Sequence, residues 1–112
     1  MSGRERRTAA RYVVGGLMLV LDGVIHETLD ISPRAVAIVR ETDVNYSRLQ
    51  VPAKFQSKSV PVLNVPIHAL QFITQRASLI VLGYESSIEG WEEILKAHDV
   101  RADMMQLEDV FG

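Results

Sequence analysis

The residues best suited to chemistry in this chain are arginines near its start and a polar segment about twenty residues later. The first group is Arg6, Arg7 and Arg11, and the second is the run Asp-Ile-Ser-Pro-Arg-Ala at residues 30–35. Because guanidinium groups bind phosphates and carboxylates through paired hydrogen bonds, the arginines require an anionic partner or water. The second segment combines a carboxylate and a hydroxyl with a proline that turns the chain, where backbone amides can meet a ligand. Together the two groups predict a binding site.

Catalytic chemistry is not indicated by the remaining residues. The chain has no cysteine, and His26, His68 and His98 lie far apart without a second ligand at a known metal-binding spacing. Ser32 lies in Ile-Ser-Pro and not in a Gly-x-Ser-x-Gly elbow, so a turn hydroxyl that bonds its own backbone is its alternative role. We therefore expect a binding protein without catalytic residues, metal or cofactor, and not an enzyme.

Charge is distributed unevenly along the chain. Residues 1–11 carry four arginines against one glutamate, a net charge of +3, whereas residues 85–112 carry eight acidic against two basic residues, a net charge of −6. A nucleic-acid polymer usually meets a broader basic surface than one short arm. Single-stranded nucleic acid also requires aromatic platforms on strands, and the one tryptophan, Trp91, falls in a predicted helix. The asymmetry favours a small, localised anion and no nucleic-acid polymer.

Length and composition indicate one globular domain. The chain has 112 residues, of which 47% are hydrophobic and 23% charged, and it contains no cysteine. These values are typical of a soluble protein that folds by packing in a reducing cytoplasm. The apolar run at residues 13–21 is about half the length of a membrane span and has no small-residue cleavage site after it, so we expect neither a signal peptide nor a membrane span.

A β-hairpin is predicted immediately after the basic arm. Strand-like segments at Leu17–Leu21 and Val24–Ile31 flank Asp22-Gly23, a dipeptide that tolerates positive φ at both turn positions. Simple alternation places residues 25, 27, 29 and 31 on one face of the second strand and residues 24, 26, 28 and 30 on the other. Pro33 then forces a corner before the apolar segment 35–39, so Ser32 is predicted where one strand passes to the next.

Further short strands follow with no long helix between them. Residues 40–59 read as a long polar loop with at most one edge strand near 51–55, and residues 60–65, 67–73 and 78–84 read as strands, the last two joined by a turn at 74–77. Short strands at this spacing predict a mainly β fold, a six-stranded antiparallel barrel whose closure removes the exposed edges.

The hydrophobic period becomes helical after Gly83. Ser86 and Glu89 have capping-box spacing, and apolar residues recur at helical intervals through Trp91, Ile94 and Leu95. We expect this face to plug an open mouth of the barrel or to cover a face of the sheet. A second turn around Met104, Leu107 and Phe111 is expected to extend that cover or to dock a partner. The predicted organisation is thus a single domain, 1–112, with a flexible basic arm (1–12), a β-barrel (13–84) and a C-terminal helical segment (86–111).

The two polar groups together resemble a known signature. The chain contains the pattern Arg7-x-x-x-Arg11 and, at a strand exit, the pattern Asp30-x-Ser32-x-x-Ala35. The two patterns are similar to the R-x-x-x-R and [D/N]-x-S-x-x-G motifs of the PilZ domain. The resemblance extends over most of the chain, including the hairpin between the motifs and the strand-then-helix ending. PilZ domains are six-stranded β-barrels with a C-terminal helix that bind the bacterial second messenger cyclic di-GMP.

The resemblance implies roles for individual residues. Arg7 and Arg11 would hold the phosphates and stack on or bond the guanines, and Asp30 and Ser32 would bond guanine edges and the ligand backbone. Arg6 and Arg34 would be auxiliary contacts. It further implies a cytoplasmic bacterial receptor that folds its arm over the nucleotide and signals through an unidentified protein partner to motility, biofilm or exopolysaccharide production, with the acidic C-terminal helix as one surface for that partner.

Ala35 departs from the family pattern, which has glycine there. If the position requires positive φ, alanine costs about 1 kcal/mol, roughly fivefold in affinity. If the glycine instead allows the ligand to approach the backbone, the methyl group obstructs binding more directly. The alternative function is therefore a PilZ-like adaptor that binds no nucleotide and acts through protein contacts.

Overall fold

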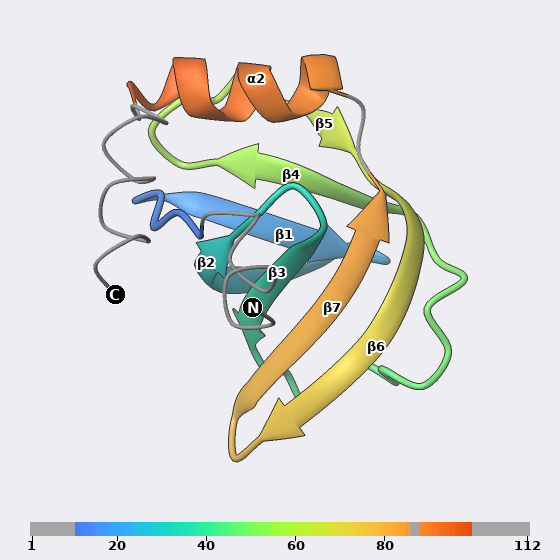
Figure 1. The fold of residues 1–112 in the computed structure, drawn as a ribbon. Helices are drawn as coiled ribbons and strands as arrows, with labels where there is room; N and C mark the ends of the chain where they lie inside the picture. The colour runs from blue at the N-terminus through green and yellow to red at the C-terminus, as the bar shows by residue number, and fades with distance from the viewer. Residues whose placement is uncertain (1–10, 86–87, 100–112) are drawn as a thin grey trace, which may run out of the picture.

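The computed structural model describes residues 11–85 and 88–99 (Figure 1). The basic arm with Arg6 and Arg7, the proposed capping residue Ser86, and the segment 100–112 with Met104, Leu107 and Phe111 lie outside the described residues. The described part is mainly β, with one helix after the last strand. Its elements are β1 (Leu17–Leu21), β2 (Val24–Ile31), β3 (Ala35–Val39), β4 (Ala53–Ser57), β5 (Val65–Pro66), β6 (His68–Arg76), β7 (Leu79–Glu85) and α2 (Ile88–Ala97).

The strands form one strongly curled antiparallel sheet in the order β5-β4-β1-β2-β3-β7-β6. The prediction of a β-rich fold with a C-terminal helix is confirmed, but the prediction of a closed six-stranded barrel is wrong. The described residues form seven strands, because the short apolar piece near residues 51–55, expected at most as an edge strand within a long loop, is β4 and pairs with both β1 and β5. The sheet stays open because the segment between β3 and β4 packs Leu49 and Val51 against the core in place of a closing strand.

The β1–β2 hairpin forms as its turn sequence predicts. Asp22 and Gly23 have φ values of 50° and 83°, which is the geometry of a two-residue turn with both central residues left-handed. The strands pair from Met18 with Glu27 to Leu21 with Val24. This register turns Leu19, Leu21 and His26 into the core.

The facing of β2 was predicted incorrectly. The pairing of β2 with β3 shifts between Thr28 and Asp30, so Leu29 is an extra residue in a β-bulge. Before the bulge His26 is fully buried and Ile25 is 56% exposed, whereas after it Ile31 is buried. One inserted residue exchanges the two faces, and for this reason strict alternation along the strand failed.

Two further strand predictions differ from the structure. The expected strand at residues 60–65 is reduced to the two residues of β5, because the amide of Leu63 bonds the carbonyl of Val60 in a turn. The turn expected at 74–77 is displaced, since β6 continues to Arg76 and the hairpin reverses at Ala77, whose φ is 53°. The resulting β6–β7 hairpin is long and extends away from α2 (Figure 1).

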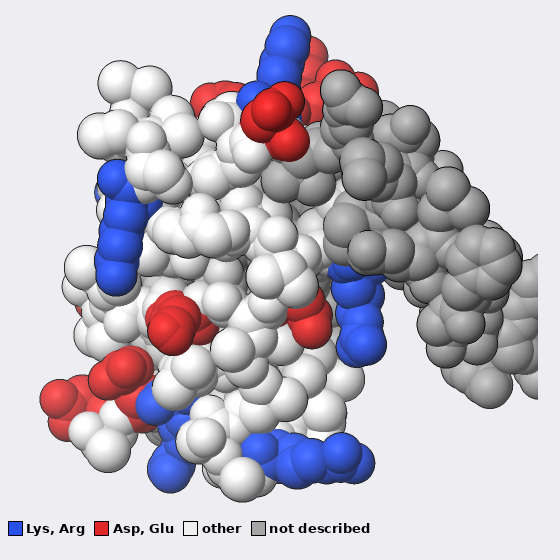
Figure 2. All heavy atoms as spheres, turned by 90° about the vertical axis from the view of Figure 1, so that its left-hand side faces the viewer, with Lys and Arg blue, Asp and Glu red and all other residues white. Residues whose placement is uncertain are grey.

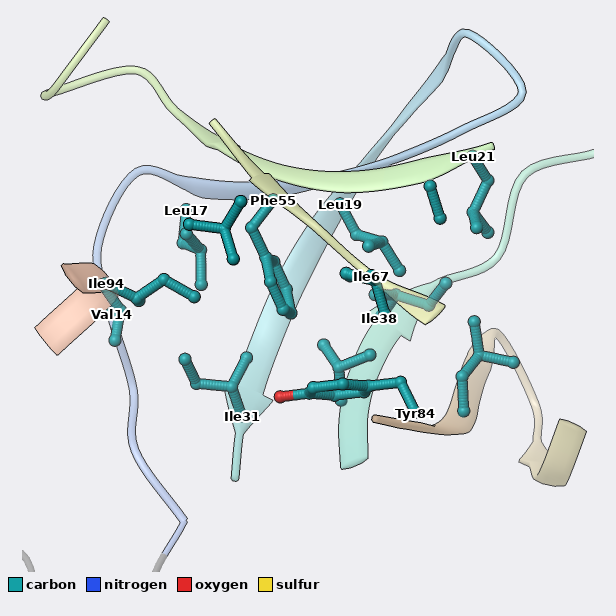
Figure 3. Packing of buried hydrophobic residues seen from close by; sticks show 14 of the residues in the cluster. Val14, Leu17, Leu19, Leu21, Ile31, Ile38, Phe55, Ile67, Tyr84 and Ile94 are labelled. Carbon is teal, nitrogen blue, oxygen red and sulfur yellow. The ribbon is translucent and has the colours of Figure 1, made fainter. Parts of the chain in front are cut away.

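The core lies inside the curl of the sheet, with α2 across one end (Figures 1 and 3). Ile94 is fully buried and points from α2 toward Leu17 and Val14, and the ring of Trp91 meets that of Tyr12 edge-to-face at 5.4 Å. Burial of an aliphatic side chain of this size contributes about 1.5–3 kcal/mol. The expected covering role of the apolar helix face is therefore confirmed.

The end of α2 is joined to β4 by a side-chain hydrogen bond. His98 Nδ1 lies 2.8 Å from the carbonyl oxygen of Ile94, which can only accept, so Nδ1 carries a proton. In the neutral ring Nε2 is then the acceptor for the hydroxyl of Ser57, 2.6 Å away. The Ser57 oxygen also accepts the amides of Ser59 and Val60, at 3.2 Å each. Ser57 thus ties the helix, β4 and the following turn together.

Candidate functional site

The chain reversal between β2 and β3 is built around Ser32. Its hydroxyl oxygen accepts the amides of Ala35 at 3.1 Å and Arg34 at 3.3 Å, and its own amide donates to the carbonyl of Ala35 at 2.8 Å. Ser32 is only 7% exposed. Its position at the passage between two strands is as predicted, and its hydroxyl bonds the local backbone, as a turn serine does.

Tyr84 on β7 supports this turn from inside the sheet. Its hydroxyl donates to the carbonyl of Ser32, and its amide donates to the carbonyl of Arg34 at 3.0 Å. In Figure 3 the Tyr84 hydroxyl points toward the Ile31 end of β2. Burial raises the pKa of Tyr84 because the phenolate would lose its hydration. No sequence pattern indicates this contact, because it joins residues 52 positions apart.

Arg11 is brought to the same turn by a short backbone pairing. The amide and carbonyl of Tyr12 bond the carbonyl and amide of Ile31, at 2.7 and 2.8 Å, in an antiparallel bridge. The exposed Arg11 therefore precedes one paired residue, and Asp30 and Ser32 flank the other. Tyr12 is buried against Trp91, which anchors the bridge in the core. Of the predicted arginine pair, the structure thus places Arg11 at the turn, and Arg7 is outside the described residues.

The charged residues at the turn are two arginines and one aspartate. Arg11 and Arg34 are exposed, and Asp30 is half-buried opposite Ala37 of β3. In the described part of the chain neither guanidinium forms an ion pair. On the face shown in Figure 2, basic side chains stand singly around the rim and most of the surface between them carries neither charge. Exposed guanidinium groups without a described ion-pair partner suit a small anion.

Ala35 begins β3 in the extended conformation. It is not among the described residues with positive φ, and it pairs with Gly83 of β7. Of the two consequences considered for an alanine here, backbone strain therefore does not apply. A Cβ built on Gly83 would lie 3.1 Å from Cδ1 of Ile73, so the side chain of Ile73 from β6 covers the strand next to Ala35.

A buried histidine–tyrosine pair holds the long segment between β3 and β4. Nδ1 of the fully buried His26 donates to the carbonyl of Val24 at 3.0 Å, which leaves Nε2 of the neutral ring to accept the Tyr46 hydroxyl at 2.7 Å. The Tyr46 oxygen in turn accepts the amide of Glu41 at 2.7 Å. Sequence reasoning found no partner for His26, because the partner lies in an irregular segment 20 residues away.

Two adjoining hollows lie away from the turn. They measure about 700 and 660 Å³ and occupy the space between residues 46–53 and the start of β6. Both are lined by Leu49, Gln50, Val51 and Leu70, and neither includes a residue of the β2–β3 turn.

Within residues 11–85 and 88–99 no three His, Cys, Asp or Glu side chains are grouped to hold a metal ion. The helix in this part of the chain is too short to cross a membrane.

Comparison with known proteins identifies the fold and not a family. No family model matches the chain, and no curated protein matches it. The crystal structure of an uncharacterized Legionella protein is similar, with a TM-score of 0.56 and 20% sequence identity over 84% of this chain and 96% of that one. At this identity the likeness concerns the fold alone.

Proposed function

We propose that this chain is a cytoplasmic bacterial PilZ-type receptor that binds cyclic di-GMP at the β2–β3 turn. It acts without catalysis and passes its state to a protein partner that controls motility, biofilm or exopolysaccharide production. The observation that carries the proposal is the Tyr12–Ile31 bridge, which brings Arg11 opposite Ser32, with Asp30 on the other side of the bridge. Residues separated by about twenty positions in the sequence thereby share one surface.

The roles proposed at the turn are those that the resemblance to the PilZ signature implies, except where the geometry of the turn changes them. Arg11 binds a ligand phosphate through its exposed guanidinium group, and Arg34 is an auxiliary cation on the turn itself. Asp30 offers a carboxylate to the N–H groups of a guanine edge. Ser32 acts as a positioning residue, because its oxygen already accepts two turn amides. Arg7, with Arg6 as an auxiliary contact, completes the site from the arm.

Titration calorimetry with cyclic di-GMP tests this proposal. We expect saturable binding, and Arg11→Ala weakens it by roughly 10- to 150-fold, the effect of losing one charge-assisted hydrogen-bonding group. Arg48→Ala is the matched control, because Arg48 is also exposed but lines the hollow beside β6. Equal affinity of the two variants would remove Arg11 from the site, and absence of binding by the unaltered protein would refute the receptor function.

A nucleotide-independent adaptor is the second candidate. It is favoured by the turn-bonded hydroxyl of Ser32 and by the methyl group of Ala35, since both reduce the polar surface that the turn presents to a ligand. An adaptor predicts no heat and no thermal shift with cyclic di-GMP, together with a protein partner whose binding is unchanged by added nucleotide. The calorimetric titration therefore separates the two candidates.

A further inference from the structure

The two edges of the sheet differ in how they meet solvent. β5 has two residues and contacts α2, so that edge is short and covered. β6 has nine residues, all exposed except Leu70, and its outer edge has no backbone partner among the described residues. The larger hollow separates the start of this edge, at Leu70–Phe72, from residues 46–51, which form no backbone hydrogen bond with β6. A long unpaired strand of this kind is a template for another strand.

The pairing of β6 with β7 fixes which side chains face inward. Phe72 and Gln75 lie opposite the core residues Leu82 and Ile80 and therefore face inward. The outward-facing residues are Gln71, Thr74 and Arg76, which lie opposite Gly83, Val81 and Leu79.

Ile73 also faces outward, because its Cδ1 lies 3.1 Å from a Cβ built on Gly83. Ile73 is the extra residue at the register shift between Phe72 and Thr74. Counted away from the Ile73–Thr74 peptide in either direction, the side chains of residues 71–76 therefore face outward, then inward, then outward.

We propose that the outer edge of β6 pairs antiparallel with β6 of a second copy of this chain, about a two-fold axis at the Ile73–Thr74 peptide. This register keeps inward residues opposite inward residues and outward residues opposite outward residues. It sets Phe72 opposite Gln75 of the second copy, and Gln71 opposite Arg76 of the second copy. Residues 69–75 carry no charged side chain, so no like charges oppose one another.

A closed dimer is the assembly that fits this edge. Pairing β6 with β6 uses the one long open edge that each described sheet has, and the other edge lies under α2. Register shifts in β6 twist the strand and limit pairing to a short segment, which disfavours open-ended addition. An interface of one strand pair is small, so the dimer is expected to be concentration-dependent.

Sedimentation equilibrium of the nucleotide-free protein tests the assembly and its register. The average mass should rise toward twice the monomer value as the concentration approaches about 1 mM. Gln71→Glu creates two symmetric pairs with Arg76 of the other copy and should tighten the dimer about two- to thirtyfold at low salt, whereas Gln71→Lys should weaken it comparably. Gln56→Glu on β4 is the control and should leave the dimer constant unchanged, because Gln56 lies far from β6 in the strand order.

The outcomes are decisive because Gln71 is exposed and both substitutions leave the core intact. A protein that remains monomeric at about 1 mM overturns the proposal and leaves the edge for a strand of a different protein. A dimer that responds equally to Gln71→Glu and Gln71→Lys overturns the register. Neither result bears on cyclic di-GMP binding, since no nucleotide is present and the β2–β3 turn is not altered.

Discussion

The hydroxyl of Tyr84 donates a hydrogen bond to the carbonyl of Ser32 and so joins the last strand of the sheet to the turn at the candidate site. Ser32 in turn bonds the amides of Arg34 and Ala35. The shape of the turn therefore depends on a buried side chain of β7. Tyr84 and Ser32 therefore stabilise the turn, whereas the exposed Arg11 and Arg34 are the side chains available to a ligand.

Tyr84→Phe should destabilise the protein by about 1–3 kcal/mol, because the buried carbonyl of Ser32 loses its donor while the packing of the ring is kept. Urea unfolding measures the change. Tyr12→Phe is the matched control, since Tyr12 is also buried but its hydroxyl has no described partner, and it should change stability by less than about 0.5 kcal/mol. Equal losses in the two variants would show that the Tyr84 hydroxyl contributes nothing specific.

Stability should fall at alkaline pH. Burial raises the pKa of Tyr84 above that of an unfolded tyrosine, about 10, so the fold favours the protonated phenol. This contribution is fully present below about pH 10 and is lost as the pH rises above it, because the unfolded chain then releases protons that the folded chain retains. Burial also raises the pKa values of Tyr12 and Tyr46, in the same direction.

Urea unfolding at a series of pH values measures this dependence. The decline should be clearly shallower in Tyr84→Phe, which removes the phenol whose pKa is raised most, and a small slope should remain from Tyr12 and Tyr46. A Tyr84→Phe variant with the full alkaline decline would show that another group causes it.

Glycine substitutions at Ala35 and Ala77 should have opposite effects. Ala35 is extended in β3, so Ala35→Gly relieves no strain and should cost about 0.5–1 kcal/mol through backbone entropy. Ala77 has a φ of 53° in the β6–β7 turn, so Ala77→Gly should stabilise by about 1 kcal/mol. Thermal unfolding of both variants provides the comparison. A gain in stability on Ala35→Gly would mean that the position is strained after all.

The sequence predicted the local features of the fold well. The Asp22-Gly23 turn, the place of Ser32 between two strands and the covering face of α2 each depend on a few neighbouring residues. What it missed depends on contacts between distant segments. The bulge at Leu29 is set by pairing with β3, and the open sheet results from how residues 40–52 pack. No local pattern encodes either one.

The candidate site could likewise be predicted from the sequence only in part. The residue types at Arg11, Asp30 and Ser32 are visible in the sequence, and their meeting at one turn requires the Tyr12–Ile31 bridge. The support from Tyr84 joins segments 52 residues apart, so spacing could not reveal it. Binding of cyclic di-GMP remains a proposal that depends on the motif and on this proximity.

Ser57→Ala should release the end of α2 and destabilise the protein by about 2–3 kcal/mol, because Ser57 is 5% exposed and its loss leaves the amides of Ser59 and Val60 and the Nε2 of His98 without their partner. Amide hydrogen exchange should accelerate in the last turn of α2 more than in β1 or β3. Ser47→Ala is the control, since Ser47 is exposed and bonds only Asn45.

The coupling between Ser57 and His98 distinguishes a specific tie from a general loss of packing. In a double-mutant cycle, Ser57→Ala should cost less in a His98→Ala background, because the histidine then leaves no unpaired nitrogen. Additive losses, or exchange in α2 that Ser57→Ala leaves unchanged, would mean that the helix is held by Ile94 and Leu95 alone. A positive coupling with faster exchange would show that one serine on β4 fixes where the helix ends.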